Sequence, residues 1–531
     1  MPGPDFDWTL NYASSREGVL AQNVVATSQP LAAQAGLRMM LDGGNAIDAA
    51  IATAITLNVV EPTSNGIGSD NFALIWAGGG LHGMNASGRS PRKLSPEHFA
   101  GQESISMRGW DGVTTPGAVA GWVSAHAQFG KLPFEKLFEP AIDYARNGFL
   151  VSRQTAYYWG LGLNNYRNFE SWQSTFAPGG RTPKVGEQFK SEAHARSLEL
   201  IAESKGESFY RGELAEKIAA HARKTNGLLT AEDLAAHKTE WVRPIEMEYH
   251  GYTLHEIPPN GQGLAALMML GIIKHLPVTD HAVDSSMWVH LQLEAMKLAF
   301  ADAHRYIADP DFMDVKVEDL LDESYLEARA RLVDPYRAQD FKHGMPKEGG
   351  TVLLATADAE GNMVSWIQSN YGGFGSGIVI PGTGIALQNR GCCFTLEEGH
   401  PNQVAGNKRP YHTIIPAFIT KDGKPVMAFG VMGGLMQPQG HAQVMIRMID
   451  HHQNPQSALD GPRWRVASGL DVALEPAFNA GVVEELRERG HNVTVASPPK
   501  MSYGRGQAIY RLDDGYFAGS DGRADGQAVG F

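Results

Sequence analysis

The sequence of 531 residues predicts a large mixed α/β or α+β fold. Strand-like segments and a small-residue helix occupy the first hundred residues, the middle from about 115 to 345 is rich in helical patterns, and strand patterns return after residue 351. Hydrophobic residues make up 43% of the chain and charged residues 19%, so a large core can be built. Strands near both ends with helices between them suit two sheets packed face to face, with helices outside.

The first elements follow from local signals. A β-branched run at 23–27 is typical of a strand, and a helix is expected over about 31–42. Gly43-Gly44 ends that helix, because glycine readily takes the left-handed conformation that closes a helix. Asn45 is expected to cap a second helix over 46–58. That helix is apolar on all sides, which predicts that it is buried.

A hairpin and two long helices come next. Strands at 72–76 and 81–85 are joined by three consecutive glycines, which favour a tight turn. The apolar run at 264–276 has helical length. Apolar positions recur at helical spacing over 285–307, where Asp309-Pro310 predicts the end of the helix.

The chain after residue 351 predicts alternating strands and helices. Asp422-Gly423 favours a hairpin turn, a helix is expected over about 437–452, and Asp513-Asp514-Gly515 favours a late hairpin. No repeat, linker or composition shift marks a domain boundary. The expected strands are 351–357, 362–370, 383–388, 414–420 and 425–430.

Composition argues against several classes of protein. The formal net charge is −13, from 45 Lys and Arg against 58 Asp and Glu, and an acidic surface repels nucleic acid. No apolar run reaches the roughly 18–20 residues of a membrane span. The N-terminus lacks the basic and apolar regions of a secretory signal. The cysteines, Cys392 and Cys393, are adjacent and unsuited to an ordinary disulfide, so a cytoplasmic location is expected.

The stretch with the strongest chemical signal is 347–377, a loop, a strand, a turn, a second strand and a glycine-rich loop. Gly349-Gly350 places the Gly350–Thr351 peptide bond in a pliable segment at the mouth of a sheet. If that bond is cut, Thr351 carries a hydroxyl nucleophile and an α-amine on one residue. An α-amine has a pKa of about 7.7–8, so it can accept the hydroxyl proton near neutral pH. By itself, Gly-Gly-Thr-Val before an apolar run is also an ordinary entry into a strand.

Motifs along the whole chain resemble the γ-glutamyltransferase family of N-terminal-nucleophile hydrolases. The resemblance implies a four-layer αββα sandwich, self-cleavage into a large subunit 1–350 and a small subunit 351–531 that stay associated, a small-molecule amide substrate, and no metal or organic cofactor. A homodimer is left open. The motifs are Gly349-Gly350-Thr351-(x)6-Asp358, Gly361-Asn362-(x)11-Phe374-Gly375-x-Gly377, Asn407-Lys408-Arg409-Pro410, Gly433-Gly434, Gly43-Gly44-Asn45-Ala46-x-Asp48-Ala49-Ala50, Glu61-Pro62-(x)3-Gly66-Ile67-Gly68 and Leu298-Ala299-Phe300-Ala301-Asp302.

The resemblance also assigns catalytic roles. Thr351 takes the place of the nucleophile, and Ser369 stands where the family has a hydroxyl that orients it. The backbone N–H groups of Gly433 and Gly434 would bind the oxyanion that develops when an amide carbonyl is attacked. Without the resemblance, Ser369 could be a solvated strand serine, and the two glycines a flexible turn.

The departures from the family pattern concern the substrate. Val352 and Leu353 replace polar or aromatic residues that follow the nucleophile in γ-glutamyl enzymes. Cys393 stands in place of the aspartate that grips the substrate amine, and Ser87 in place of the arginine that grips the carboxylate. The remaining candidates for binding a smaller carboxylate are Arg89, Tyr371, Arg390, His412 and Thr413.

These observations favour a self-processed threonine amidohydrolase that cleaves the amide of a small carboxylate. The family resemblance extends to a cytoplasmic branch that hydrolyses oxamate and to glutaryl-type cephalosporin acylases. Two alternatives remain: a true γ-glutamyltransferase or glutathione hydrolase, and an uncleaved, non-catalytic binding protein. Other catalytic motifs, such as a P-loop, a Gly-x-Ser-x-Gly elbow or zinc-type histidine spacing, are absent from the sequence.

Overall fold

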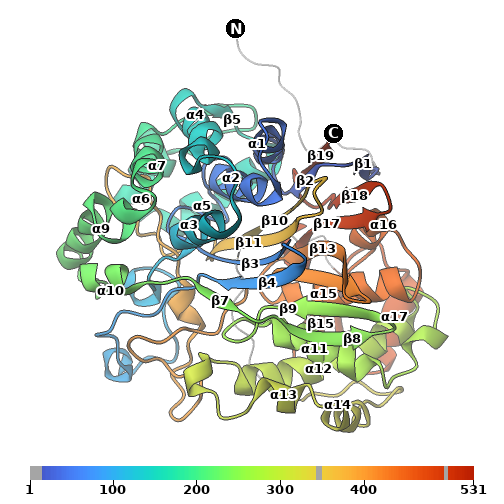
Figure 1. Cartoon of the computed structure of the whole chain (residues 1–531). Helices are drawn as coiled ribbons and strands as arrows, with labels where there is room; N and C mark the ends of the chain where they lie inside the picture. The colour runs from blue at the N-terminus through green and yellow to red at the C-terminus, as the bar shows by residue number, and fades with distance from the viewer. Residues whose placement is uncertain (1–14, 342–349, 496–499) are drawn as a thin grey trace.

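The computed structural model describes residues 15–341, 350–495 and 500–531, except for the side chains of residues 500 and 501. Two antiparallel seven-stranded sheets face each other in the middle of the molecule, with helices outside both (Figure 1). The predicted four-layer αββα sandwich is therefore confirmed. Sequence-distant strands lie side by side in each sheet, so the segment after residue 350 cannot form its sheet without the first hundred residues.

The first sheet has the order β19-β2-β10-β11-β3-β4-β7 and the second has the order β1-β18-β17-β13-β12-β9-β8. In the first sheet these strands are Gln527–Gly530, Val24–Thr27, Gly350–Ala357, Met363–Tyr371, Asp70–Ala77, Gly80–Asn85 and Glu240–Val242. In the second they are Val19–Ala21, Gly515–Ser520, Arg505–Leu512, Lys424–Met432, Ala417–Lys421, Tyr252–Glu256 and Ile245–Tyr249.

A buried apolar layer joins the two sheets. It includes Leu353 and Ile367 from the first sheet and Phe418, Ala428 and Ile509 from the second, none more than 1% exposed. Alternate residues of each strand point into this layer, and the others point toward the helices, which is why both sheets read as nearly continuous hydrophobic runs.

Helices cover the outer face of each sheet and complete two further cores. Those in the layer of the first sheet include α1 (Pro30–Leu41), α2 (Ala46–Val60), α3 (Ala118–Phe129), α4 (Glu139–Asn147), α5 (Arg153–Tyr166), α6 (Glu170–Phe176) and α7 (Glu192–Ser204). Those in the layer of the second include α11 (Gly263–Ile273), α12 (Ser286–Tyr306), α15 (Met436–Ile449), α16 (Pro455–Asp460) and α17 (Ala480–Glu488).

The junction between α1 and α2 confirms the predicted caps. Gly43 has φ +92°, and Asn45 forms a capping box with Asp48. Every residue of α2 is buried, as expected from its apolar composition. The carboxylate of Asp358, in the turn between β10 and β11, accepts a hydrogen bond from the N–H of Ala46 at 2.7 Å. The family motif at Asp358 thus fixes the N-terminus of α2 to the central hairpin.

One predicted strand is wrong. Residues 383–388 form isolated bridges rather than a strand, with Val379 paired to Ala386 and Leu387 to Gly68. Gly382 and Gly384 have φ of +72° and +73°, which interrupts an extended chain on both sides of Thr383. The apolar run there fills the core under α7 instead of joining a sheet.

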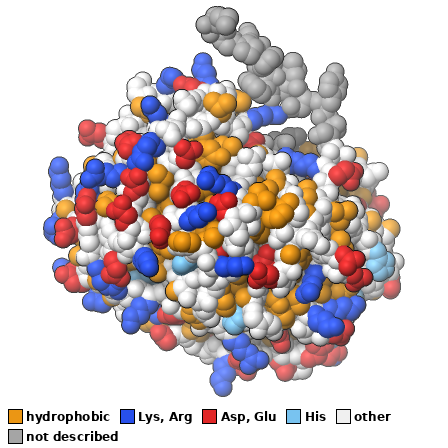
Figure 2. All heavy atoms as spheres, turned by 45° about the horizontal axis from the view of Figure 1, so that its top comes forward, with side chains coloured by type: hydrophobic (Ala, Val, Ile, Leu, Met, Phe, Trp, Pro, Cys, Tyr) orange, Lys and Arg blue, Asp and Glu red, His pale blue; other side chains and the backbone are white. Residues whose placement is uncertain are grey.

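On the face drawn in Figure 2, the described Lys and Arg side chains are interspersed with Asp and Glu, with hydrophobic areas between them. In the part of the chain that the structure describes, no helix is both long enough and apolar enough to cross a membrane. Location in the cell stays a prediction.

A buried ion pair fastens the end of the second sheet. Asp521 accepts hydrogen bonds from Arg463 at 2.7 Å and from the N–H of Gly506 at 2.8 Å, and it is fully buried. Burial alone would raise the pKa of Asp521, but Arg463 and Arg523 outweigh burial and lower the pKa from 3.8 to about 2.

Replacing Asp521 by asparagine is expected to destabilise the fold by about 3–5 kcal/mol at neutral pH, because Arg463 would be left buried without its counter-ion. Since the folded pKa of Asp521 is depressed, its contribution is present above pH 3.8 and lost as the pH falls toward about 2. Melting curves from pH 7 to 2 check this. Asp319, which is exposed, provides the control Asp319→Asn. Equal melting temperatures for Asp521→Asn and the control would contradict the account.

Candidate active site

Thr351 lies at the start of the central strand β10, where its pairing with β11 is irregular. Gly350 pairs with Tyr371 and Val352 with Gln368, so two residues of β11, Ser369 and Asn370, lie opposite Thr351. Such a bulge re-aims side chains at the end of a ladder. It places the Thr351 and Ser369 hydroxyl oxygens 3.1 Å apart.

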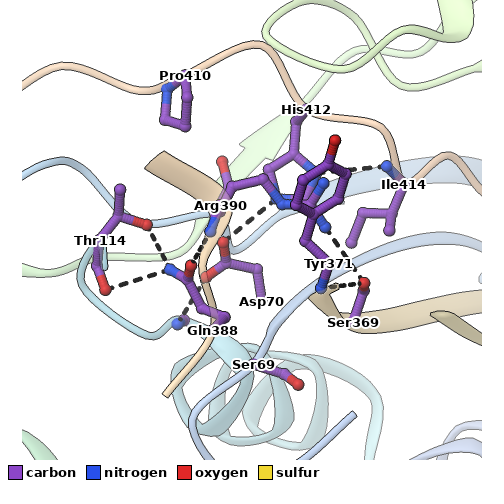
Figure 3. Close-up of polar contacts among 12 residues, drawn as sticks. Ser69, Asp70, Thr114, Ser369, Tyr371, Gln388, Arg390, Pro410, His412 and Ile414 are labelled. Atoms are coloured by element: carbon purple, nitrogen blue, oxygen red, sulfur yellow. Dashed lines mark hydrogen bonds and ion pairs between the residues drawn. The ribbon is translucent and has the colours of Figure 1, made fainter. Parts of the chain in front are cut away.

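Ser369 belongs to a buried hydrogen-bond cluster, and Figure 3 shows its contacts with Tyr371 and Arg390. Its hydroxyl donates to the carbonyl oxygen of Gly350 at 2.8 Å. It accepts from the backbone N–H of Tyr371 at 2.7 Å and from the Arg390 guanidinium at 3.2 Å. The sequence-predicted residues Thr351, Ser369, Tyr371 and Arg390 are therefore brought together around the Gly350–Thr351 bond.

Arg390 is fully buried beside Ser369. It donates to the Thr413 hydroxyl at 2.6 Å, and its guanidinium carbon lies 4.6 Å from the centre of the Tyr371 ring. Burial would raise the pKa of the neighbouring Cys393, but a hydrogen bond from Cys392 and the charge of Arg390 lower it below the ordinary value. Thr413 and Tyr371 thus both contact Arg390.

Asp70 and His412 are buried beside Arg390, and its charge acts on both of them. Burial raises the pKa of Asp70 to about 7, against the opposing effect of Arg390. Burial, reinforced by Arg390 and Arg409, lowers the pKa of His412 well below its ordinary value, so this histidine is neutral. His412 Nδ1 accepts from the N–H of Ile414 at 3.4 Å, so the ring hydrogen is on Nε2, which lies 3.2 Å from Asp70 Oδ2 and donates to it. A neutral His412 engaged in this way lacks the charge to hold a carboxylate.

Gly433 and Gly434 lie between β13 and α15, as predicted, with φ of +134° and +59°. Their carbonyl oxygens accept hydrogen bonds from Met436 N at 3.0 Å and Gln437 N at 3.3 Å, and Gln262 Nε2 also donates to Gly434 O at 2.8 Å. Among the described residues these bonds engage the carbonyl groups of the pair, and Gly433 faces the cleft described next.

A cleft of about 330 Å³ connects this region with solvent. Gly350, Gly433 and Thr63 line it together, so the predicted cleavage site and one oxyanion glycine face the same space. The rest of the lining combines aromatic and basic side chains. It includes Met107, Arg108, Tyr158, Leu161, Tyr166, Phe374 and Arg465.

Arg108 is held at the cleft by stacking. Its guanidinium carbon lies 4.4 Å from the centre of the Tyr166 ring, and Nη1 donates to Met107 O at 3.1 Å. The Tyr166 hydroxyl lies 3.0 and 3.1 Å from the carbonyl oxygens of Gly372 and Gly375 and shares its one hydrogen between them, which fixes the glycine-rich loop. Burial raises the pKa of Tyr166 to about 12, so it stays a donor. Within the described residues, Arg108 has no carboxylate partner within 4.0 Å.

Arg89 is not part of this cluster. It pairs with Asp309 at 2.6 Å, donates to Asn407 O at 3.2 Å, and lines a separate cavity with Arg409 and Glu240. Ser87, at the position where γ-glutamyl enzymes have the carboxylate-binding arginine, is fully buried and donates to Asn85 Oδ1 at 2.7 Å.

One group of described side chains has metal-ligand chemistry, namely His290, Glu294 and His491. The ammonium of Lys297 already occupies the group, donating to Glu294 at 2.7 Å and lying 3.3 Å from His491 Nδ1. The two imidazoles also hydrogen-bond each other at 2.8 Å. With its donors and acceptors matched internally, this cluster fits a structural role better than a metal site.

The sandwich of two antiparallel sheets between helical layers, with a threonine at the start of a central strand, defines an N-terminal-nucleophile hydrolase fold. The family profile described as gamma-glutamyltranspeptidase matches residues 32–531, and the chain belongs to that family. The protein is an enzyme of the hydrolase and acyltransferase type that acts on amides.

Three relatives illustrate the similarity. The crystal structure of a cephalosporin acylase from Bacillus halodurans is 48% identical, has a TM-score of 0.94 and covers 100% of this chain and 99% of its own. The glutathione hydrolase-like YwrD proenzyme of Bacillus subtilis is 36% identical over 96% of this chain and 98% of its own. The oxamate amidohydrolase proenzyme of Klebsiella pneumoniae is 35% identical over 94% of this chain and 97% of its own.

The sequence reasoning missed Asp70, Arg108 and Tyr166. Asp70 could not be predicted as a site residue, because its raised pKa comes from burial beside Arg390, and no local sequence motif indicates that burial. Arg108 and Tyr166 come from loop and helix segments far from residue 351, and only the fold places them at the cleft.

Proposed function

We propose that this protein is a proenzyme that cleaves itself between Gly350 and Thr351 and then hydrolyses amides of small carboxylate-bearing substrates. The new α-amine of Thr351 takes the hydroxyl proton, the oxygen attacks the amide carbonyl, and the amine passes the proton to the leaving nitrogen. The N–H groups of Gly433 and Gly434 bind the oxyanion, and water releases the acyl group from Thr351.

The observation that carries this proposal is the arrangement around the Gly350–Thr351 bond. The Thr351 hydroxyl lies 3.1 Å from Ser369, whose hydroxyl donates to the Gly350 carbonyl, and Gly350 shares a cleft with Gly433. The similarity to proenzymes supports self-cleavage. The family membership also favours a catalytic protein over the non-catalytic alternative.

The charge of the cleft supports an anionic substrate. Arg108 is half-buried on an aromatic ring at the cleft, and guanidinium groups bind carboxylates through paired hydrogen bonds. Arg390 lies behind Ser369 and Arg89 lies in another cavity, which leaves Arg108 and Arg465 as the arginines of the cleft lining. We assign the substrate carboxylate to Arg108, because within the described residues it has no carboxylate within 4.0 Å and its guanidinium is held in place on the Tyr166 ring. The aromatic walls of Tyr158, Tyr166 and Phe374 would contact the carbon chain.

A panel of amides tests the proposal and separates its alternatives. Oxamate, a γ-glutamyl anilide and a glutaryl amide are assayed with mature protein, each beside an analogue whose carboxylate is esterified. We expect hydrolysis of at least one anionic amide and little of its neutral analogue. Preferred turnover of the γ-glutamyl anilide, with transfer to added dipeptide, would favour the transferase alternative. Turnover of the neutral analogues alone would contradict the anionic-substrate assignment.

Replacing Arg108 by glutamine is expected to raise KM for the preferred anionic substrate roughly 10- to 100-fold, because a charged hydrogen bond is lost. The kcat should change only a few-fold, since the reacting groups stay in place. Arg181→Gln, which removes an exposed arginine paired with Glu187, is the matched control. Unchanged KM in Arg108→Gln would remove Arg108 from the site.

A further inference from the structure

Three donors face the hydroxyl oxygen of Ser369, namely Thr351 Oγ1, the Tyr371 N–H and Arg390 Nη2, and this oxygen can accept only two hydrogen bonds. A serine hydroxyl has one hydrogen to donate and two lone pairs. Tyr371 N–H at 2.7 Å and Arg390 Nη2 at 3.2 Å both point at this oxygen. A backbone N–H and a guanidinium in a protein are permanent donors, so together they fill both lone pairs.

The direction of the remaining hydrogen follows. With its lone pairs filled, Ser369 donates its own hydrogen, and the nearest acceptor is the carbonyl oxygen of Gly350 at 2.8 Å. The Thr351 hydroxyl, 3.1 Å away, then has no lone pair of Ser369 to donate into. Its proton is left for the nitrogen of its own residue.

We propose that Arg390 is a positioning residue for self-cleavage, which makes Ser369 an obligate donor to the carbonyl of the Gly350–Thr351 bond. This inference rests on the proposed function. Removing Arg390 would free a lone pair, and the Ser369 hydroxyl could then rotate and donate its hydrogen to the Thr351 oxygen instead of the Gly350 carbonyl.

Self-cleavage needs no reactant other than water. The Thr351 oxygen bonds to the Gly350 carbonyl carbon, and negative charge grows on the carbonyl oxygen to which Ser369 donates. The carbon–nitrogen bond breaks, and the hydroxyl proton of Thr351 ends on the nitrogen as an amine. Water then hydrolyses the ester, leaving a carboxylate on Gly350 and a free hydroxyl and amine on Thr351.

Neighbouring side chains fix the position of the Arg390 guanidinium beside Ser369. Thr413 accepts from Nη1 at 2.6 Å, and the Tyr371 ring covers one face at 4.6 Å. Asp70, fully buried, is close enough for the charge of Arg390 to act on it. The electrostatic effect of Arg390 on the Gly350 carbonyl oxygen, transmitted through the Ser369 hydroxyl, is larger in this buried site than it would be in water, because the local dielectric is low.

The test follows self-cleavage of full-length protein on denaturing gels and by intact mass after expression in the cold. Arg390→Met is expected to slow cleavage roughly 10- to 100-fold, the size of one lost charged hydrogen bond. Arg447→Met also removes a buried arginine, paired with Asp284 away from the cleft, and should mature at the wild-type rate. Equal rates for Arg390→Met and wild type would overturn the inference.

A double variant separates positioning from a general structural role. If Arg390 acts through Ser369, Ser369→Ala combined with Arg390→Met should cleave within about threefold of Ser369→Ala alone. Multiplied effects in the double variant would overturn the inference. If Arg390→Met does not fold, Arg390→Lys decides, because its ammonium keeps a charged donor. It should mature within about tenfold of wild type, and a rate as slow as that of Ser369→Ala would overturn the inference.

These outcomes differ from failure of the proposed function itself. If the Gly350–Thr351 bond of the wild-type chain is never cleaved, the proposed function is contradicted. If that bond is cleaved equally fast in wild type and in Arg390→Met, only the role of Arg390 is contradicted.

Discussion

Replacing Thr351 by alanine is expected to abolish both amide hydrolysis and the break after residue 350. Alanine keeps the strand and its burial but removes the only hydroxyl that can attack the Gly350 carbonyl from the adjacent residue. Removal of the nucleophile in other acyl-transfer enzymes lowers kcat by on the order of 10⁶-fold, and a similar loss places activity below detection. The assay is turnover of the preferred amide, run beside a denaturing gel.

Thr351→Ser is the matched variant, because serine keeps the hydroxyl and loses only a methyl group. It should still cleave itself and retain part of the wild-type activity. The fold should survive in both variants, since β10 is held by pairing with β2 and β11 along its length. An active Thr351→Ala protein would show that another group attacks the substrate.

Replacing Gly434 by alanine is expected to lower kcat by about 10²- to 10³-fold with little change in KM. Gly434 has φ +59°, where an L side chain is strained, so the backbone would turn and tilt the N–H groups away from the oxyanion. Losing one such donor costs about 2.7–4 kcal/mol of transition-state stabilisation.

Gly423 offers a matched control for backbone strain. It has φ +70° in the exposed turn between β12 and β13, and an added Cβ there would meet no other atom within 4 Å. Gly423→Ala therefore carries similar local strain away from the cleft and should keep kcat within about twofold. If Gly434→Ala has the same kcat as Gly423→Ala, the two glycines do not form the oxyanion site.

The central elements could be predicted from sequence because their signals are local. The Asn45 cap, the apolar helix α2 and the Asp422-Gly423 turn each depend on a few neighbouring residues, and all three are found. Strands β8 and β9 were missed within a middle region expected to be helical. β9 pairs with β12, which lies about 165 residues further along the chain, and β8 is the edge strand that pairs with β9. Because this pairing supplies much of their stability, their own local pattern is weak.

The residues of the candidate site also fall into two groups: those that local motifs predict and those that only the folded structure brings together. Thr351, Ser369 and the glycine pair could be predicted because motifs of the family surround them. Arg89 and Arg390 looked equivalent as basic residues near motifs, yet one pairs with Asp309 and the other contacts Ser369. The bulge opposite Thr351 and the burial of Asp70 depend on the folded sheet, and so no spacing rule could supply them.

The most direct measurement is intact-mass analysis with N-terminal sequencing of an active preparation. We expect two fragments, 1–350 and 351–531, with the smaller beginning Thr-Val-Leu-Leu-Ala-Thr and the two together heavier than the uncut chain by one water. An active preparation in which Thr351 is still joined to Gly350, or in which the break falls elsewhere, would contradict the account.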